Sequence, residues 1–400
     1  MRIAFVSFEF GEYCVRHVAE MSGEHDVLLV LPHSEAEPWK AELAAVDWFG
    51  FDAPRLRQPW RQWRTARQLL RRIHAFQPDV VHFQSGHLWF NWALPRLRRY
   101  PLVLTVHDAR HHVGDRISQK TPQFVLDYGV RQADQIIVHS RTLTETLTDE
   151  LGVSESRVHV VPHVAIGQQK VTVRADKDDR VVGVLDAFPE EPHTLLFFGR
   201  IWEYKGLEYL IRAEPIIARE IPDVRIIIAG TGEDFDRYRR LMTDPDRYEV
   251  HNCYVSDALR SELFQRSAVV VLPYIEATQS GVVPVAYAHR RPVIATRTGG
   301  LPEVVEDQRT GLLVPPRDAE SLASAAIRLL RGADLRRAMG IAGYEKLNDE
   351  SSPDVVARLT LDVYRQAIQQ RRPTASCMTC PSRDATENVT GMSSPETTKA

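Results

Sequence analysis

The stretch Leu272–Glu303, which reads LPYIEATQSGVVPVAYAHRRPVIATRTGGLPE, contains two apolar strands that are each followed by a turn and a helix. Ser280 is predicted to cap the first helix, because a serine side chain there accepts a hydrogen bond from a helical amide. Pro284 fits this start, since the first amides of a helix have no internal partner for a proline to remove. The second strand, Pro292–Thr296, leads through a glycine turn to Glu303. Two strand-to-helix turns at one sheet edge predict a nucleotide-binding crevice.

The start of the first helix is also predicted to bind an anion. Its amides at Gly281, Val282 and Val283 lack partners within the helix and would point toward one spot. The positive end of the helix dipole favours a phosphate there, and Gly281 has no side chain to keep the ligand away. We therefore expect phosphates of a nucleotide at this turn.

The overall composition narrows the class of protein. A chain of 400 residues with 44% hydrophobic residues is long enough for two or three domains with sizeable cores. The formal net charge of −3 gives no general signal for nucleic acid. No apolar run approaches the ~20 residues that span a bilayer, and the first residues are typical of a strand rather than a signal peptide. Four scattered cysteines favour a reducing compartment, so we expect a cytoplasmic protein.

The first half of the chain alternates strand-like and helical patterns. The predicted strands are Arg2–Phe8, Asp26–Leu31, Asp79–Phe83, Leu102–His107, Gln135–His139 and Val158–Val161. The clearest helices are Trp60–Phe76 and Arg141–Leu151, and a further helix is expected at Thr121–Gln132. This alternation is typical of a doubly wound parallel sheet, which binds ligands at the carboxyl ends of its strands.

A second alternating series follows a charged stretch that we interpret as a linker. Its predicted strands are Thr194–Phe198, Arg225–Ala229, Val250–Tyr254, Val269–Leu272, Pro292–Thr296 and Leu312–Val314, and its predicted helices are Gly206–Glu220, Phe235–Met242, Asp257–Ser267 and Ala319–Arg331. The pattern predicts two Rossmann-like α/β domains that face each other across a cleft.

The domain boundaries follow from these two series. We assign residues 1–166 to the N-terminal domain, 167–192 to the linker and 193–350 to the C-terminal domain. A last helix, 353–370, is expected to join the N-terminal domain. The Ser-, Thr- and Pro-rich tail, 372–400, is expected to be disordered, and its lone Cys-x-x-Cys motif has no second pair with which to form a metal site.

The segment FGRIWEYKG, residues 198–206, is the second informative stretch. Gly199 and Arg200 follow a predicted strand, and Lys205 stands before a predicted helix. An arginine fork and a mobile lysine charge suit the two phosphates of a nucleoside diphosphate, although two surface cations would give the same pattern. The glycine turn at Gly232, which follows the next strand, is predicted to accommodate a base or ribose, but a lone GxG motif is weak.

At this point the sequence resembles a known family. The motifs GR…KG, AGTGE and PVIAT–GGLPE–TGLLV, in this order, are similar to those of the retaining glycosyltransferases of family four, which have the GT-B fold. The resemblance covers most of the chain and is strongest over residues 195–315. It implies transfer of a sugar from a nucleotide-diphosphate donor with retention at the anomeric carbon, and it implies that no metal ion or other cofactor is needed. By this likeness, Arg200 and Lys205 neutralise the leaving diphosphate.

The same resemblance assigns donor contacts in the stretch quoted first. Glu276 would touch the donor sugar, although capping of the helix is an alternative role for it. The remaining donor-binding positions implied are Gly199, Gly232, Gln279, Ser280, Gly281, Val282, Gly300 and Glu303. The sequence departs from the family at Val285, which aligns with the glutamate that usually holds the ribose.

In the N-terminal half, His107 and Asp108 follow an apolar strand. The resemblance places His107 beside the donor sugar and its phosphates, and Asp108 is predicted to orient it or to bind the acceptor. A metal site built from His107, Asp108, His111 and His112 has suitable ligand types, but the fold implied needs no metal.

Other polar residues of this half are weaker candidates. Gly11 is predicted to lie in an acceptor-side loop after the first strand, where Glu9 is a further candidate. His82 and His87 line the acceptor cleft or are ordinary structural histidines. His163 receives no chemical role.

The stretch Arg55–Arg72 contains seven arginines and no acidic residue. Trp60, Trp63 and Ile73 recur at helical spacing and predict an amphipathic helix with a cationic flank. Arginines with interfacial aromatic residues are typical of surfaces that bind anionic lipids, so we expect peripheral association with the inner face of the membrane. The alternative is a core-packed helix with a solvated basic face. No nucleic-acid-binding motif accompanies the charge.

The sequence therefore predicts a glycosyltransferase that uses a nucleotide sugar and a saccharide or lipid-linked acceptor, as in surface polysaccharide or glycolipid synthesis. Two rival functions remain open. One is a nucleotide-sugar epimerase or hydrolase of the same fold, which would convert the donor without an acceptor. The other is a degenerate protein that binds nucleotide sugars without catalysis, which Val285 makes plausible.

Overall fold

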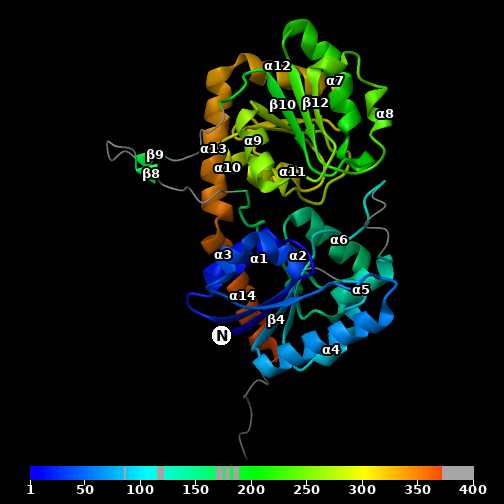
Figure 1. The fold of residues 1–400 in the computed structure, drawn as a ribbon, viewed down its shortest axis with the longest axis vertical. Coiled ribbons are helices and arrows are strands. Elements are labelled where there is room, and N and C mark those ends of the chain that lie inside the picture. The colour runs from blue at the N-terminus through cyan, green and yellow to red at the C-terminus, as the bar shows by residue number, and fades with distance from the viewer. Residues whose placement is uncertain (85–86, 115–120, 168–173, 176–180, 183–188, 372–400) are drawn as a thin grey trace, which may run out of the picture.

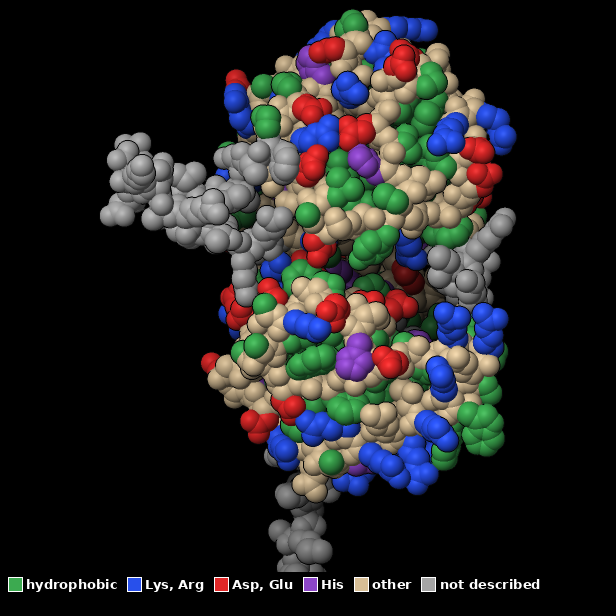
Figure 2. Space-filling model, in the orientation of Figure 1, with side chains coloured by type: hydrophobic (Ala, Val, Ile, Leu, Met, Phe, Trp, Pro, Cys, Tyr) green, Lys and Arg blue, Asp and Glu red, His purple; other side chains and the backbone are tan. Residues whose placement is uncertain are grey.

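The computed structural model describes residues 1–84, 87–114, 121–167, 174–175, 181–182 and 189–371. Two α/β domains lie end to end, and the surface is hollowed between them (Figures 1 and 2). Each domain contains one parallel sheet, so the predicted pair of Rossmann-like domains is confirmed. The predicted disorder of residues 372–400 lies outside the described residues.

The N-terminal domain is built on a seven-stranded sheet in the order β3-β2-β1-β4-β5-β6-β7. Its strands are β1 (Arg2–Val6), β2 (Asp26–Pro32), β3 (Asp47–Phe51), β4 (Val80–Phe83), β5 (Leu102–Thr105), β6 (Gln135–Val138) and β7 (Val158–Val160). Its helices are α1 (Gly11–Met21), α2 (His33–Ala36), η1 (Glu37–Trp39), α3 (Lys40–Leu43), α4 (Pro59–Phe76), η2 (Asn91–Leu97), α5 (Gln123–Gln132), α6 (Arg141–Leu151) and η4 (Glu155–Arg157). All strand pairs in this sheet are parallel.

The C-terminal domain has a six-stranded parallel sheet in the order β12-β11-β10-β13-β14-β15. Its strands are β10 (Thr194–Phe198), β11 (Arg225–Ala229), β12 (Tyr248–His251), β13 (Val269–Leu272), β14 (Val293–Thr296) and β15 (Gly311–Val314). Its helices are η6 (Glu203–Lys205), α7 (Leu207–Glu220), α8 (Asp236–Arg239), η7 (Pro245–Arg247), α9 (Asp257–Arg266), α10 (Val282–Ala288), α11 (Leu301–Val304), α12 (Ala319–Arg331) and α13 (Ala333–Ser351). Within the predicted linker, β8 (Arg174–Ala175) pairs antiparallel with β9 (Val181–Val182).

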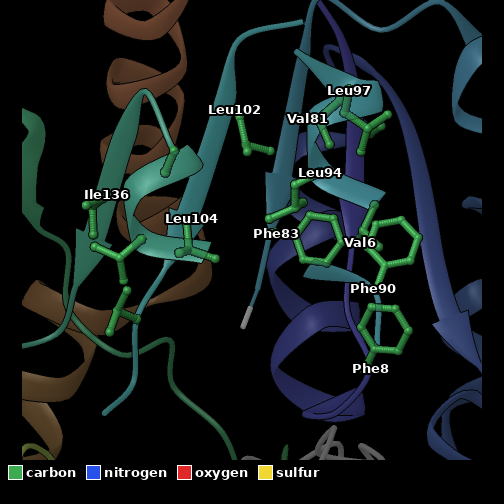
Figure 3. Close-up of a cluster of buried hydrophobic side chains, with 14 of the residues drawn as sticks. Val6, Phe8, Val81, Phe83, Phe90, Leu94, Leu97, Leu102, Leu104 and Ile136 are labelled. Carbon is green, nitrogen blue, oxygen red and sulfur yellow. The ribbon is translucent and has the colours of Figure 1, made fainter. Parts of the chain in front are cut away.

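The core of the N-terminal domain forms where alternate strand residues meet η2 and α4. Phe83 and Phe90 stack with ring centroids 5.1 Å apart, and η2 adds Leu94 beside Phe83 and Leu97 beside Val81 (Figure 3). Burying each such side chain stabilises the fold by roughly 1.5–3 kcal/mol. This packing fixes the ends of β4 and β5, where the predicted site residues begin.

The chain returns to the N-terminal domain through α14 (Pro353–Arg371), which packs against α1 (Figure 1). Tyr364 of α14 is fully buried, and its hydroxyl lies 2.6 Å from Nδ1 of His82. The other ring nitrogen of His82 lies 2.8 Å from the hydroxyl of Thr105. His82 is therefore a satisfied core residue, and its suggested place in the acceptor cleft is wrong. His87 likewise stacks on Phe8 with centroids 4.2 Å apart, at the edge of this core.

The sequence patterns missed α13, a helix of 19 residues that runs from the C-terminal domain toward the N-terminal one (Figure 1). Two glycines within it are usually unfavourable in a helix. A Cβ atom on Gly340 would lie 2.0 Å from the carbonyl oxygen of Arg290, and one on Gly343 would lie 2.5 Å from the ring of Tyr287. Both glycines let α13 pack closely against the α10 region, so tertiary contact overrides local propensity here.

Candidate functional site

The cationic wall of the cleft lies at the end of β10. Gly199 has φ of 121°, which brings the exposed Arg200 out of the strand end. Lys205 closes the short helix η6, and its Nζ lies 3.7 Å from the ring centroid of Tyr274. Gly206 follows with φ of 64°, and a Cβ there would lie 1.9 Å from the carbonyl oxygen of Pro273. The turn therefore needs this glycine to hold Lys205 beside the β13 loop.

Gly232 and Gly300, which the sequence predicts to bind the donor, allow two backbone segments to pack closely. A Cβ on Gly232 would lie 1.9 Å from the carbonyl oxygen of Ile201, and one on Gly300 would lie 2.4 Å from that of Thr278. The loops that follow the strands of the C-terminal sheet thus pack against one another. The glycine turns that the sequence predicts at this edge of the sheet lie in these loops.

Helix α10 begins one residue later than predicted, with Gly281 rather than Ser280 in the N-cap position. The hydroxyl of Ser280 still accepts a hydrogen bond from the amide of Val282, at 3.2 Å. Gly281 has φ of −68°. A Cβ on Gly281 would make only ordinary contacts, the nearest being 3.7 Å from Nε2 of His163. The expected phosphate turn therefore faces a histidine of the opposite domain.

Val285, which replaces an acidic residue of the resembled family, is buried on α10. A Cβ on Gly167 would lie 2.9 Å from a methyl group of Val285. Its side chain thus packs against the start of the linker. A carboxylate in that apolar place would carry a desolvation cost, which is why valine fits there.

A hydrogen-bonded contact between the domains surrounds Asp108. The hydroxyl of Thr278 donates to the carboxylate of Asp108, which also accepts from Nε2 of His112 at 3.1 Å. Burial favours the neutral acid, but the bonds from His112 and Thr278 and the nearby histidines hold the pKa of Asp108 well below its usual value. Asp108 is therefore an ionised anchor between the two domains, not a hydrogen-bond partner of His107 in this structure.

Glu276 belongs to the same contact. Its Oε2 accepts a hydrogen bond from the amide of Val113 at 3.3 Å and lies 3.8 Å from Nδ1 of His112. The ring of His112 stacks on Tyr204, with centroids 4.4 Å apart and an interplanar angle of 12°. The predicted sugar-binding carboxylate is thus held by the N-terminal loop in this conformation. We name the set Asp108, His112, Val113, Glu276 and Thr278 the interdomain latch.

Two further predicted site residues have structural partners. The carboxylate of Glu303 accepts hydrogen bonds from the amides of Arg141 and Thr142, at 2.7 and 3.1 Å, and so caps α6 of the other domain. Gly11 is the first residue of α1 rather than part of a loop, and its amide donates to Glu35 at 3.0 Å. Glu303 therefore contributes a domain–domain contact, and Gly11 a close helix approach.

The acceptor-side wall surrounds a cavity of about 450 Å³. His107, Asp108, Glu9 and Leu126 line it together with Arg200 from the opposite domain. Burial and the charge of Glu35 raise the pKa of Glu9, while Arg200 opposes this shift. The cavity thus brings together a histidine and acidic groups of the N-terminal domain and a cation of the C-terminal domain.

His107 also belongs to a cluster that the sequence patterns did not identify. Its ring centroid lies 4.9 Å from that of His139, which lies 5.2 Å from that of His163. The signal was present, because each histidine comes one to three residues after the end of a neighbouring strand: β5, β6 and β7. Parallel strands present these ends at the same edge of the sheet.

The metal site considered from His107, Asp108, His111 and His112 is not supported by the geometry. Among the described residues, no group of three or more His, Cys, Asp or Glu side chains is arranged to hold a metal ion. None of the helices within the described residues has the length and apolar character of a membrane-spanning helix.

Comparisons with known proteins agree with this architecture. Residues 192–332 match the family described as glycosyl transferases group 1, and residues 11–164 match Glycosyltransferase Family 4. The chain is 27% identical over 296 residues to the D-inositol 3-phosphate glycosyltransferase of Corynebacterium diphtheriae, covering 68% of this chain and 67% of that one.

Solved structures show the same fold. Sucrose-phosphate synthase of Thermosynechococcus elongatus superposes with a TM-score of 0.70 at 18% identity, covering 92% of this chain and all of that one. Anabaena HepE in complex with UDP-glucose superposes with a TM-score of 0.64 at 16% identity, covering 92% and 99%. The two family matches together span both domains, and the chain belongs to the family-four glycosyltransferases with the GT-B fold.

Proposed function

We propose that this glycosyltransferase moves a sugar from a nucleotide-diphosphate donor to a saccharide acceptor, with retention at the anomeric carbon and without a metal ion. The observation that carries the proposal is the position of Arg200, which lines the same cavity as His107 and Asp108. Lys205 follows five residues later, on the loop that packs on Tyr274. Bond cleavage to the donor sugar places negative charge on the leaving diphosphate, and fixed cations stabilise such charge.

Each polar residue receives a role in this reaction. Arg200 and Lys205 bind the diphosphate, assisted by the amides of Gly281 and Val282. Two cations at this place supply the charge stabilisation that a metal ion gives in other transferases. His107 contacts the donor sugar, and Glu276 positions it once the interdomain latch has released its carboxylate. One solved neighbour contains UDP-glucose, which makes this donor the first to test.

We further propose that the acceptor is a glycan on a lipid carrier and that α4 holds the protein against an anionic membrane. Trp60 and Trp63 are 77% and 54% exposed, whereas Leu69 and Ile73 form the buried side of this helix. The tryptophans therefore do not belong to the core. Figure 2 shows Lys and Arg side chains gathered over this part of the N-terminal domain. The exposed arginines are Arg55, Arg57, Arg61, Arg64, Arg67 and Arg71.

Sedimentation with vesicles tests the membrane proposal. Replacing Arg61, Arg64, Arg67 and Arg71 by Gln is expected to abolish binding to phosphatidylserine vesicles, because each arginine near such a surface contributes about 1 kcal/mol. The matched control replaces four exposed arginines of the C-terminal domain, Arg212, Arg219, Arg225 and Arg240. Equal binding of both variants, or no binding by the parent protein, contradicts the proposal.

Donor turnover tests the reaction. UDP-, GDP-, ADP- and dTDP-glucose are incubated with EDTA, with and without a lipid-linked saccharide or inositol 3-phosphate as acceptor. The expected result is acceptor-dependent release of nucleoside diphosphate and an α-linked product by NMR, since the donor is an α-glycoside. Conversion of the donor without any acceptor favours an epimerase or hydrolase. Binding of a donor without turnover under all conditions favours a non-catalytic binding protein.

A further inference from the structure

Three histidines, two of them buried and the third half-buried, form the floor of the cleft on its N-terminal side. His107, His139 and His163 follow β5, β6 and β7, and Tyr13 of α1 covers them, with its ring centroid 4.9 Å from that of His163. His107 and His139 are 7% and 5% exposed. Three imidazoles in contact at one sheet edge exceed what packing requires, because apolar side chains would fill this space without burying polar atoms.

Hydrogen bonds fix the protons on two of these rings. Nδ1 of His139 donates to the carbonyl oxygen of Val161 at 2.8 Å, and Nδ1 of His163 donates to that of Val164 at 2.9 Å. A carbonyl only accepts, so the second nitrogen, Nε2, has a bare lone pair in the neutral ring. Within the described part of the chain, the buried Nε2 of His139 has no hydrogen-bond partner. Such an unsatisfied buried atom is typical of a ligand-binding position.

Burial keeps the three rings neutral. Desolvation, followed by the proximity of His163, lowers the pKa of His107 to about 4. Desolvation likewise lowers the pKa of His139 and of His163, to which Glu12 gives a smaller opposite effect. At neutral pH the floor of the cleft is therefore uncharged.

The charged groups around the cluster leave the three histidines neutral. Glu12 is already paired with Arg16 and Arg260, at 3.0 and 3.2 Å. The other titratable groups that face the cluster or its cavity are Tyr13 and His17 of α1, His82 of β4, Asp108 after β5, Arg141 of α6, Glu303 of α11, and Lys346 and Glu350 of α13. Lys346 bonds to Glu350 at 2.8 Å, and Glu303 caps α6. His139 and His163 are thus neutral side chains of this cavity that can take up a proton when a new charge binds.

The cluster lies against the place where the donor phosphates are proposed to bind. Nε2 of His163 would be 3.7 Å from a Cβ built on Gly281, and His139 and His163 line a cavity of about 460 Å³ with Gln279 and Ser280. A lone pair repels a phosphate oxygen, whereas a protonated ring donates a strong hydrogen bond to it. A doubly charged diphosphate next to these rings favours their charged form.

We propose that His163 and His139 bind the diphosphate of the donor in their protonated form, so that donor binding takes up a proton from solvent at Nε2. This inference rests on the proposed function, because it needs a diphosphate at the Gly281 turn. It adds two phosphate-binding residues to Arg200 and Lys205. Unlike those two, the histidines make the affinity for the donor depend on pH near neutrality.

Calorimetry of UDP-glucose binding in two buffers with different ionisation enthalpies tests the inference, since the diphosphate of this probe does not titrate near pH 7. The expected result is uptake of about one proton per bound molecule at pH 7, with a Kd that rises by up to about tenfold from pH 6 to pH 7. His163→Asn and His139→Gln are each expected to reduce the uptake by at least half. His193→Asn, a surface histidine paired with Asp223 before β10, is the matched control and leaves the uptake unchanged.

The outcomes separate this inference from the proposed function. Binding of UDP-glucose without proton exchange, or uptake that survives in both variants, overturns the inference alone. If UDP-glucose does not bind, the same titration is made with GDP-, ADP- and dTDP-glucose. Failure of all four to bind overturns the proposed nucleotide donor and this inference with it.

Discussion

The two walls of the cleft differ in the charge of the side chains that line them. The C-terminal wall carries two basic side chains, Arg200 and Lys205, and the guanidinium of Arg200 is charged at any physiological pH. The N-terminal wall carries His107, His139 and His163, whose pKa values burial lowers so that the three rings are neutral at pH 7. Under the proposed function, the first wall attracts the donor with permanent charge, whereas the second takes up charge when the donor binds.

The largest effect is expected from removing the two basic side chains of the C-terminal wall. Arg200→Ala and Lys205→Ala are each expected to lower kcat/KM by about 100-fold or more, because each removes a cation from charge that develops in the transition state. Steady-state kinetics with the identified donor measure this effect. The control is Arg219→Ala, an exposed arginine near the end of α7, which should retain parental activity. Parental activity in either cleft variant would mean that the site is wrongly assigned.

The buried histidines also predict an acid-sensitive N-terminal domain. Burial, then the charge of His163, lowers the pKa of His17 to about 3, and neither of its ring nitrogens has a partner among the described residues. Between pH 6.5 and 3 the unfolded state binds a proton that the folded state excludes. Stability is therefore retained above pH 6.5 and falls by about 1.4 kcal/mol per pH unit below it for such a group.

The substitution His17→Phe tests whether His17 lowers the stability of the N-terminal domain in acid. Phenylalanine suits the site, since the ring of His17 meets the edges of Phe5 and Tyr13 at 5.5 and 5.6 Å. At pH 5 the variant is expected to be about 2 kcal/mol more stable than the parent, with a smaller gain at pH 7. Urea unfolding followed by tryptophan fluorescence reports mainly on the N-terminal domain, which contains six of the seven tryptophans. An equal gain at both pH values would show that only packing had changed.

The C-terminal domain was the easier one to predict from its sequence. The expected strands Thr194–Phe198, Arg225–Ala229 and Val269–Leu272 coincide with β10, β11 and β13. Each is a continuous apolar run that ends in a glycine or proline turn, and both faces of its sheet are buried. The motif residues Arg200 and Lys205 also lie within seven residues of a strand end, so local sequence was enough to place them at the sheet edge.

The N-terminal site depends on contacts that no local pattern contains. Strand β3 was missed because DWFGF includes a glycine and begins with an acid, both uncommon in strands. The histidine cluster joins residues more than 50 positions apart in the chain, and the interdomain latch joins Asp108 to Thr278, 170 residues away. Only the strand order of the sheet and the closure of the domains bring these groups together.

Weakening the interdomain latch tests whether it competes with the donor, because in this conformation the N-terminal domain holds Glu276 of the C-terminal domain. Thr278→Val removes the hydroxyl that donates to Asp108 and keeps the size of the side chain. We expect the KM for the donor to fall about fivefold, because a lost hydrogen bond of about 1 kcal/mol no longer favours the form that occupies Glu276. Thr144→Val, at a hydroxyl with no partner in the described residues, is the control. An unchanged or higher KM would show that the latch does not compete with the donor.

The smallest expected effect concerns Glu303, for which two roles are in competition. If it binds the donor, as the family resemblance implies, Glu303→Gln raises the KM for the donor and leaves thermal stability unchanged. If its main role is the cap on α6 that the structure shows, the KM stays within about twofold while stability falls by about 1 kcal/mol. We expect the second result, since both carboxylate oxygens of Glu303 already accept hydrogen bonds, from the amides of Arg141 and Thr142 and from the hydroxyl of Thr142. Thermal unfolding beside donor kinetics measures both quantities, with the exposed Glu320→Gln on α12 as the control for loss of one negative charge.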